Sequence, residues 1–192
     1  TIRQENLALF KKGCEIAHLI GAKGVLDNAP LPPWQFPADI PVVRHYEEAI
    51  LSRATLAQDL NWKSYWKDLI HTYQAACDIA AEFGLTYQMH PAMGVLAANT
   101  DGFLYFAEAV NRPNLRFNFD TANLFVIKEN LALSLIRLAN YIDYIHISDN
   151  GGIHTEHLAI GDGVIPWDSF FKALQRIDFK GHLGIDIGGS ES

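Results

Sequence analysis

The chain has 192 residues, enough for one domain with a sizeable core, and we treat residues 1–192 as a single domain. Its hydrophobic fraction of 49% argues against disorder, and no apolar run reaches the ~18 residues of a membrane span. The formal charge is −7 and no run of lysines or arginines is present, so a nucleic-acid partner is not expected. Two cysteines without a disulfide framework, and no signal peptide pattern, predict a cytoplasmic protein.

The first half of the chain alternates predicted helices and strands. Apolar residues at near-helical spacing predict helices over 3–20 and 62–83. Strands are predicted over 21–28, from a weak pattern, and over 85–90, from a strong one.

The stretch 30–61 between these elements contains five prolines, which exclude a long helix in its first part. It is either a long surface connection or an active-site loop that carries Trp34, because long loops in compact domains are often functional. A short helix is expected within 43–59. The sequence leaves the two interpretations of the stretch open.

The second half continues the alternation, with turns of a few residues between the elements. The elements predicted there are a helix over 100–110, a strand over 115–120, a helix over 128–140, a strand over 142–148, a helix over 168–176 and a strand over 182–187. Asn99 or Thr100 is a suitable cap for the first of these helices, and Asp168 for the last. This order implies βαβ units and a parallel sheet whose successive strands are neighbours.

Four of the predicted strands carry a polar side chain near their carboxyl end. Strand side chains alternate between two faces, so each of these strands has one apolar and one polar face. If the strands are parallel and adjacent, the polar groups converge where α/β sheets and barrels hold their sites. The four residues are Gln88, Asp120, His146 and Asp186.

Two carboxylates and one imidazole, from Asp120, His146 and Asp186, suit Mn²⁺, Mg²⁺, Co²⁺ or Zn²⁺. A divalent ion there would polarise a carbonyl and stabilise an enediolate, while a carboxylate moves a proton between carbons. Taken singly, each residue also has a structural explanation: Asp120 caps a turn, and His146 is a hydrogen-bonded core histidine. The repetition of one polar group per strand, on the same face, favours the site.

Four more residues extend this candidate site. His90 shares the polar face of its strand, so it can contact substrate or replace a ligand. Asn123 either holds the turn beside it or touches substrate. His154 and His157 lie in a glycine-rich segment, where each is either a substrate contact over the barrel mouth or part of a solvated loop.

Four segments together resemble the xylose isomerase-like TIM-barrel superfamily, which includes sugar and sugar phosphate isomerases and epimerases, related dehydratases and endonuclease IV. They are HISDNGGIHTEHLAIGDGVIPW (146–167), FDTANL (119–124), HLGIDIGG (182–189) and YQMHP (87–91). The resemblance implies an α/β fold, a TIM (β/α)8-type barrel. That barrel has eight strands in about 250 residues. Five are visible here, so the barrel is expected to lack its N-terminal strands and to have open edges at 21–28 and 182–187.

The resemblance also implies roles for individual residues. In the family a Glu, an Asp, a His and a second Glu at strand ends bind one divalent metal, and the two glutamates serve as acid and base. The corresponding ligands here are Gln88, Asp120, His146 and Asp186, with Asp186 and then His90 as the proton-transfer groups. Asp186 is one methylene shorter than Glu, and the Gln88 amide has an oxygen to offer a metal but is no general base.

We therefore expect a divalent-metal sugar or sugar phosphate isomerase or epimerase that acts by proton transfer through an enediolate on a small sugar or polyol. The alternatives are a dehydratase of the same superfamily and a degenerate barrel that binds sugar or metal without turnover. An abasic-site endonuclease is disfavoured, because no basic DNA-facing surface is visible. The open edges point to a fragment of a longer protein or to a homo-oligomer that covers them.

Overall fold

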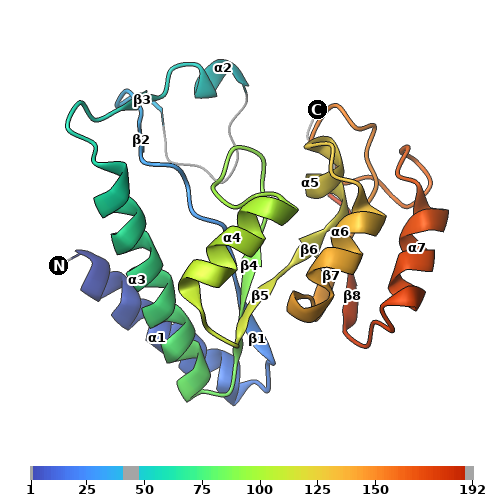
Figure 1. Ribbon diagram of the computed structural model, residues 1–192, viewed down its shortest axis with the longest axis horizontal. Helices are drawn as coiled ribbons and strands as arrows, with labels where there is room; N and C mark the ends of the chain where they lie inside the picture. Colours follow the sequence, from blue (N-terminus) through green and yellow to red (C-terminus); the bar gives the residue numbers. More distant parts are fainter. Residues whose placement is uncertain (1, 41–47, 189–192) are drawn as a thin grey trace.

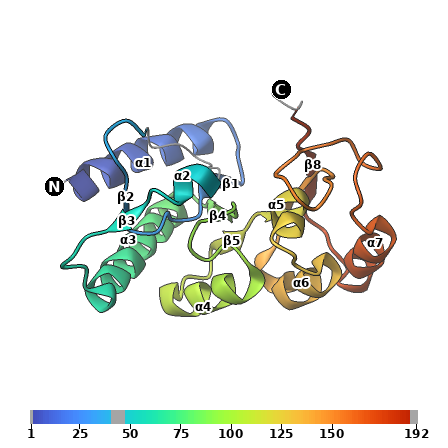
Figure 2. The same cartoon turned by 90° about the horizontal axis from the view of Figure 1, so that it is seen from above.

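The computed structural model describes residues 2–40 and 48–188 of the chain. Helices and strands alternate along it, and the strands lie inside an arc of helices, as Figures 1 and 2 show. The fold is the α/β type that the alternation predicts, an incomplete TIM-type barrel.

The strands of the barrel form two parallel sheets, ordered β1-β4-β5 and β6-β7-β8. Their bounds are Gly24–Asn28 (β1), Thr86–His90 (β4), Leu115–Phe117 (β5), Phe119–Asp120 (β6), Tyr144–Ile147 (β7) and His182–Ile185 (β8). β5 and β6 are two halves of the strand predicted over 115–120. They are interrupted at Asn118, whose peptide N–H donates to the carbonyl of Met89 at 3.0 Å. With the halves counted as one, the described residues contain the five parallel strands expected from the sequence.

Helices with an apolar stripe cover the outer side of these strands (Figure 2). Their bounds are Ile2–Leu19 (α1), Trp62–Glu82 (α3), Thr100–Val110 (α4), Leu131–Leu138 (α6) and Trp167–Arg176 (α7). An asparagine side chain begins three of them by accepting a peptide N–H of the first turn, at Asn61, Asn99 and Asn130. Among the described helices, none is both long and apolar enough to cross a membrane.

Three local predictions need correction. Asp168 does not cap α7, because the cap position is Pro166 and Asp168 pairs instead with Lys172. The helix predicted over 128–140 is shorter, since α6 gives way to a 3-10 turn at Ala139–Tyr141. A short helix, α5 (Thr121–Val126), follows β6 where only a turn was expected.

The proline-rich stretch forms a small antiparallel pair, β2 (Trp34–Gln35) with β3 (Thr55–Leu56), and a single turn of helix, α2 (Glu48–Leu51). Part of the helix predicted over 43–59 falls on residues 41–47, which lie outside the described residues. The pair and α2 lie toward the carboxyl ends of the strands, at the top of Figure 1. The stretch is therefore at the end of the barrel that carries the candidate site.

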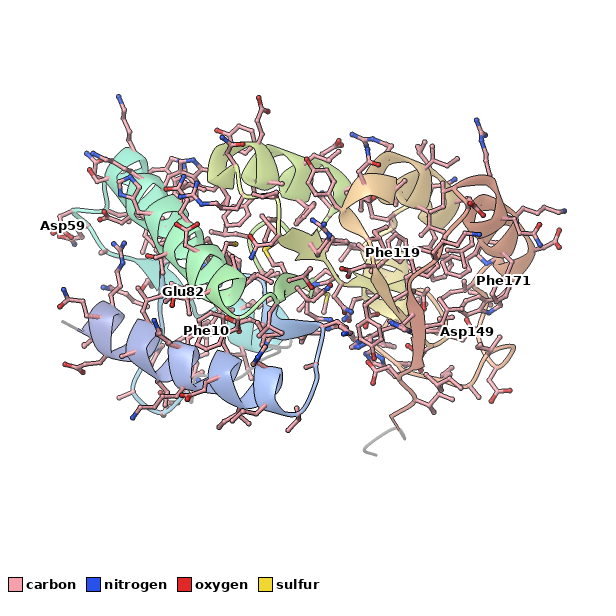
Figure 3. All side chains as sticks on the ribbon, turned by 90° about the horizontal axis from the view of Figure 1, so that it is seen from below. Phe10, Asp59, Glu82, Phe119, Asp149 and Phe171 are labelled. Carbon is pink, nitrogen blue, oxygen red and sulfur yellow. The ribbon has the colours of Figure 1, made fainter. Side chains whose placement is uncertain are left out.

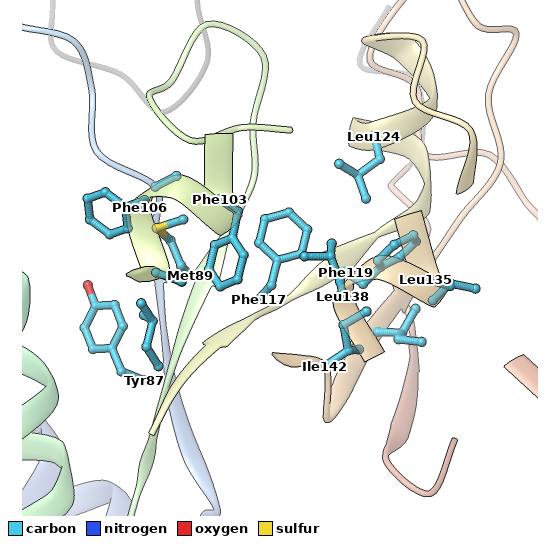
Figure 4. Close-up of a cluster of buried hydrophobic side chains, with 14 of the residues drawn as sticks. Tyr87, Met89, Phe103, Phe106, Phe117, Phe119, Leu124, Leu135, Leu138 and Ile142 are labelled. Carbon is cyan, nitrogen blue, oxygen red and sulfur yellow. The ribbon is translucent and has the colours of Figure 1, made fainter. Parts of the chain in front are cut away.

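The core fills the space between the strands and the helices. Met89 of β4 and Phe117 of β5 lie beside Phe103 and Phe106 of α4 (Figure 4), and Tyr87 of β4 packs against Tyr73 of α3, with ring centroids 5.6 Å apart. The Phe103 and Phe117 rings are 4.7 Å apart between centroids. Each fully buried side chain of this size contributes roughly 1.5–3 kcal/mol. The outward faces of the strands thus hold the barrel together, and their inward faces are left for polar residues.

A second packing layer lies at the α1 end of the sheet. Phe10 projects from α1 toward α3 (Figure 3), and its ring centroid is 5.7 Å from that of Tyr87. This contact packs α1 against β4, the strand that carries His90 and with which β1 pairs in parallel.

Both outer strands are open edges, as predicted. In the described part of the chain, β1 pairs with β4 alone and β8 with β7 alone. Leu26 on β1 is 43% exposed, and Leu183 and Ile185 on β8 are 48% and 76% exposed. Apolar side chains beside unpaired backbone groups invite further strand pairing.

Candidate functional site

Three of the predicted ligands lie together at the carboxyl ends of neighbouring strands. Asp120 ends β6, His146 belongs to β7, and Asp186 directly follows β8. Asp120 and His146 are register partners. The Nδ1 atom of His146 is 3.6 Å from Oδ2 of Asp120 and 3.4 Å from Oδ2 of Asp186. The alternation of strand faces and the parallel order are sufficient to produce this cluster.

The two oxygens of Asp120 do different things. Oδ1 accepts the peptide N–H of Asn123 at 2.8 Å and so caps α5. Oδ2 is buried and has no hydrogen-bond partner within the described residues. Burial alone would raise the pKa of Asp120, but neighbouring groups, among them the His146 imidazole and the Asn123 N–H, outweigh it and lower that pKa. Asp120 can therefore cap a helix with one oxygen and bind an ion with the other.

His146 presents an equally unpartnered atom. Its Nδ1 is buried, and no described residue makes a hydrogen bond to it. The ring lies between those of Tyr144 and His90, with centroids 5.1 Å and 5.2 Å away. A buried imidazole nitrogen and a buried carboxylate oxygen that both lack a hydrogen bond are costly unless a ligand satisfies them.

Asp186 and His157 form the open side of the cluster. The side chain of Asp186 is 44% exposed, and its Oδ2 is 3.5 Å from Nδ1 of His157. The same Nδ1 lies 3.0 Å from Oγ of Ser148 and 3.2 Å from the carbonyl oxygen of Asp186. The structure thus brings His157, predicted as a substrate contact, to the edge of the cluster.

His90 lies on the other side of Asp120 and is almost fully buried, with 1% exposure. Its Nε2 is 3.8 Å from Oδ2 of Asp120. Its Nδ1 is 2.6 Å from Oδ1 of Asn118, and Nε2 is 3.2 Å from Nδ2 of Asn123. Asn123 therefore holds the turn after Asp120, as one of its two interpretations expected, and it also lies beside His90; its contact with substrate stays a prediction.

The other predicted residues lie elsewhere. The amide nitrogen of Gln88 donates to Oγ1 of Thr86 at 2.8 Å and to the carboxylate of Asp143. Asp143 precedes β7, so these bonds direct Gln88 toward the amino ends of the strands, away from the three ligands.

His154 is exposed on its loop. Trp34 packs edge-on against Phe36 in the β2 segment, with centroids 5.9 Å apart.

Two groups of donor atoms could hold an ion, and they share Asp120. One is His90, Asp120 and His146, and the other is Asp120, His157 and Asp186; within each group the donor atoms lie within 4.8 Å of one another. Two ligand atoms each about 2.1 Å from a tetrahedral ion are about 3.4 Å apart. The separations around His146 are close to that value. The unpartnered Asp120 oxygen and His146 nitrogen are a donor set that fits a divalent metal.

Two further residues shape the site, and sequence reasoning gave neither of them a role. Asn118 is two residues before Asp120 and so faces the inside of the barrel. The alternation of side chains along the strand could have indicated this position. Asp149, fully buried after β7, accepts four donors: the peptide N–H groups of Asn150, Gly161 and Ile165 and the indole N–H of Trp167. These bonds fix the loop that carries His157. Figure 3 shows Asp149 beside α7.

The chain is similar in sequence to known proteins. The family model described as xylose isomerase-like TIM barrel matches residues 1–191. An L-ribulose 3-epimerase from Methylomonas sp. is 28% identical over 122 residues, covering 62% of this chain and 41% of that protein. A ketose 3-epimerase from Arthrobacter globiformis is 33% identical over 78 residues, covering 41% of this chain and 25% of that protein. The chain therefore matches less than half the length of these two relatives.

Solved structures show the same fold. A D-tagatose 3-epimerase-like protein superimposes with a TM-score of 0.72 at 20% identity, over 97% of this chain and 63% of that one. The IOLI protein, crystallised with a bound zinc atom, gives a TM-score of 0.70 at 19% identity, over 96% of this chain and 60% of that one.

Proposed function

Because the chain belongs to the xylose isomerase-like TIM-barrel family, we propose that it is the site-bearing part of a divalent-metal sugar epimerase or isomerase that acts on a ketose. The observation that supports this most directly is the pair of buried, facing atoms Asp120 Oδ2 and His146 Nδ1, 3.6 Å apart and each lacking a hydrogen bond from any described residue. The similarity to two ketose 3-epimerases favours epimerisation beside a ketone.

Asp120, His146 and Asp186 would hold the ion, because Nδ1 of His146 lies 3.6 Å and 3.4 Å from the carboxylate oxygens of the other two. His90 or His157 would be a further donor, since His90 groups with Asp120 and His146, and His157 with Asp120 and Asp186. A bound Mn²⁺, Mg²⁺, Co²⁺ or Zn²⁺ supplies Lewis-acid polarisation of the substrate carbonyl. Asp120 is kept ionised by its neighbours, so it is ready to bind a cation without first losing a proton.

Proton transfer falls to the carboxylate that a ketose can reach. Asp186 is 44% exposed, whereas Asp120 is fully buried, so Asp186 is the better group to take a proton from the carbon beside the carbonyl. His90 is the second candidate because its Nε2 lies 3.8 Å from Oδ2 of Asp120, but with 1% exposure it ranks behind Asp186. Gln88 has no basic atom and is bonded to Asp143, which leaves it outside this step.

The test combines metal binding with turnover. We expect stoichiometric binding of Mn²⁺ or Zn²⁺ in a calorimetric titration. We also expect interconversion of ketose epimers, with L-ribulose as the first substrate, that stops when a chelator is added. Because the chain spans only part of its relatives, turnover should be measured on this chain and on any longer product of its gene. The matched variants are His146→Gln and, as a control outside the cluster, His154→Gln.

The outcomes separate the proposals. Loss of metal binding in His146→Gln but not in His154→Gln supports the site, and equal binding in both contradicts it. The main alternative is a barrel that binds sugar or metal without turnover. It is favoured by Gln88, because a glutamine stands where the family has a glutamate, so the site lacks one of the two acid–base carboxylates. Tight metal binding with no activity on any ketose would support that alternative.

A further inference from the structure

Four residues form a hydrogen-bonded chain that passes through His90. The Nδ2 atom of Asn123 lies 3.1 Å from the carbonyl oxygen of Pro91 and 3.2 Å from Nε2 of His90. On the other side of the ring, Nδ1 of His90 lies 2.6 Å from Oδ1 of Asn118. All three side chains are buried, with at most 1% exposure.

The carbonyl of Pro91 determines the direction of every bond in this chain. A backbone carbonyl only accepts hydrogen bonds, so the Asn123 atom that faces it must be the NH₂ group rather than the oxygen. The same NH₂ group then donates its other hydrogen to Nε2 of His90, which must be unprotonated. The proton of the neutral ring is consequently on Nδ1 and is donated to Oδ1 of Asn118.

The reverse arrangement is unfavourable. If Nε2 carried the proton, it would have to donate to the oxygen of Asn123, and that oxygen would then face the Pro91 carbonyl oxygen at about the same 3.1 Å separation. Two acceptors would meet in a buried place, where an unsatisfied polar group costs roughly 1–3 kcal/mol. Asn123 cannot swing away easily, because its peptide N–H is held by Asp120 at 2.8 Å.

We propose that Asn123 is a positioning residue that holds His90 as the neutral Nδ1–H tautomer and leaves its unprotonated Nε2 directed at Asp120. Nε2 and the Asp120 Oδ2 atom, 3.8 Å apart, are then two acceptors rather than an ion pair. Such a pair attracts an electropositive group, either a metal ion or a substrate hydroxyl hydrogen. The tautomer follows from the hydrogen bonds alone. Only the role of Nε2 toward a metal ion or a substrate rests on the proposed function.

The test reads the tautomer directly. Protein labelled with ¹⁵N in its histidines is studied without metal or substrate at mildly alkaline pH, by long-range ¹H–¹⁵N correlation of the imidazole rings. The His90 signals are identified by their absence in His90→Gln. We expect a protonated Nδ1 and an unprotonated Nε2, and a protonated Nε2 overturns the proposal.

Two isosteric variants test which amide is responsible. Asn123→Asp replaces the donor by an acceptor, and we expect it to move the His90 proton to Nε2. Asn118→Asp keeps an acceptor opposite Nδ1, so the tautomer should stay as in the unmodified protein. An unchanged tautomer in folded Asn123→Asp contradicts the role of Asn123. If that variant does not fold, the measurement on the unmodified protein still decides the tautomer.

The result is independent of turnover. A protein with no ketose epimerase activity but with the Nδ1–H tautomer would contradict the proposed function and support the assignment of Asn123. An active enzyme with an Nε2–H tautomer would do the opposite.

Discussion

Oδ2 of Asp120 and Nδ1 of His146 lie 3.6 Å apart on adjacent strands, both buried, and nothing in the described part of the chain hydrogen-bonds to either. Folded proteins seldom leave two such atoms facing each other unsatisfied. A cation bound between them would remove the cost of leaving both atoms buried without a partner. This pair is therefore the centre of the proposed site.

We first predict that Asp120→Asn greatly weakens divalent-metal binding while the fold is kept. The amide oxygen can still accept the Asn123 N–H and cap α5, but the negative charge is lost. Changes to outer partners of metal sites typically cost 10–100-fold in affinity, so loss of a ligand charge should cost at least about 100-fold. Calorimetric titration with Mn²⁺ and Zn²⁺ measures it.

The matched control for that change is Asp168→Asn, on the exposed face of α7. It removes the same charge far from the strand ends and should leave the metal affinity as it was. Equal weakening by both substitutions would mean that only the net charge of the protein matters.

A second prediction concerns Gln88→Glu. Gln88 donates to the carboxylate of Asp143, so the new carboxylate would lose this bond and face a like charge. We expect the free energy of unfolding to fall by about 1–3 kcal/mol, with no gain in metal affinity. Urea unfolding and a metal titration measure the two quantities. Tighter metal binding without destabilisation would restore Gln88 as a ligand, as the family resemblance implies.

The third prediction links Asp149 to acid stability. Burial alone would raise its pKa, but the Trp167 indole and the peptide N–H groups around it lower that pKa below the usual value. The stabilisation is therefore present above the unfolded pKa of about 3.9 and is lost as the pH falls through the folded value. Asp149→Asn turns an NH₂ group toward existing donors, and it should cost about 1–3 kcal/mol at neutral pH.

The measurement is the free energy of unfolding as a function of pH. The Asp149→Asn curve should be flatter on the acid side than that of the unmodified protein, and the two should converge at low pH. A constant offset down to the lowest pH at which the protein folds would show that Asp149 acts through packing and not through its charge.

A fourth prediction addresses the open edge at β8. Ile185 is 76% exposed beside unpaired backbone groups, so Ile185→Lys should reduce self-association, since a charge on an edge opposes strand pairing. The free energy of unfolding should change by no more than about 0.5 kcal/mol. Sedimentation velocity measures the association, and Leu133→Lys, at a 53% exposed position on α6, is the control. An equal effect of both variants would contradict a specific role of the edge.

Much of the site could be predicted from local pattern. Strand side chains alternate, and parallel strands end at the same side of a barrel, so Asp120, His146 and Asp186 had to meet if the three strands were neighbours. Those two rules need only the sequence and the order of elements. Local patterns also predicted the five strands, whereas both open edges were predicted from the family resemblance, which implies an eight-stranded barrel.

What local pattern could not decide is how far each side chain reaches and what it meets. Gln88 and His90 lie on the same face of one strand, yet Gln88 is bonded to Asp143 at the amino end of β7 and His90 to Asn118 near the carboxyl ends. The stagger between strands and the free torsions of each side chain determine such contacts, and neither leaves a signal in the alternation.

The sequence by itself thus determined which residue types face the inside of the barrel and at which end of their strands they stand, because strand periodicity and chain order are local properties. Only the tertiary structure decided that Asp120 divides its two oxygens between a helix cap and the cluster, and that the Pro91 carbonyl orients the amide of Asn123 against His90. The cap joins residues three apart, but the second outcome depends on atoms from segments about 30 residues apart being held within hydrogen-bond distance, which packing establishes and periodicity does not.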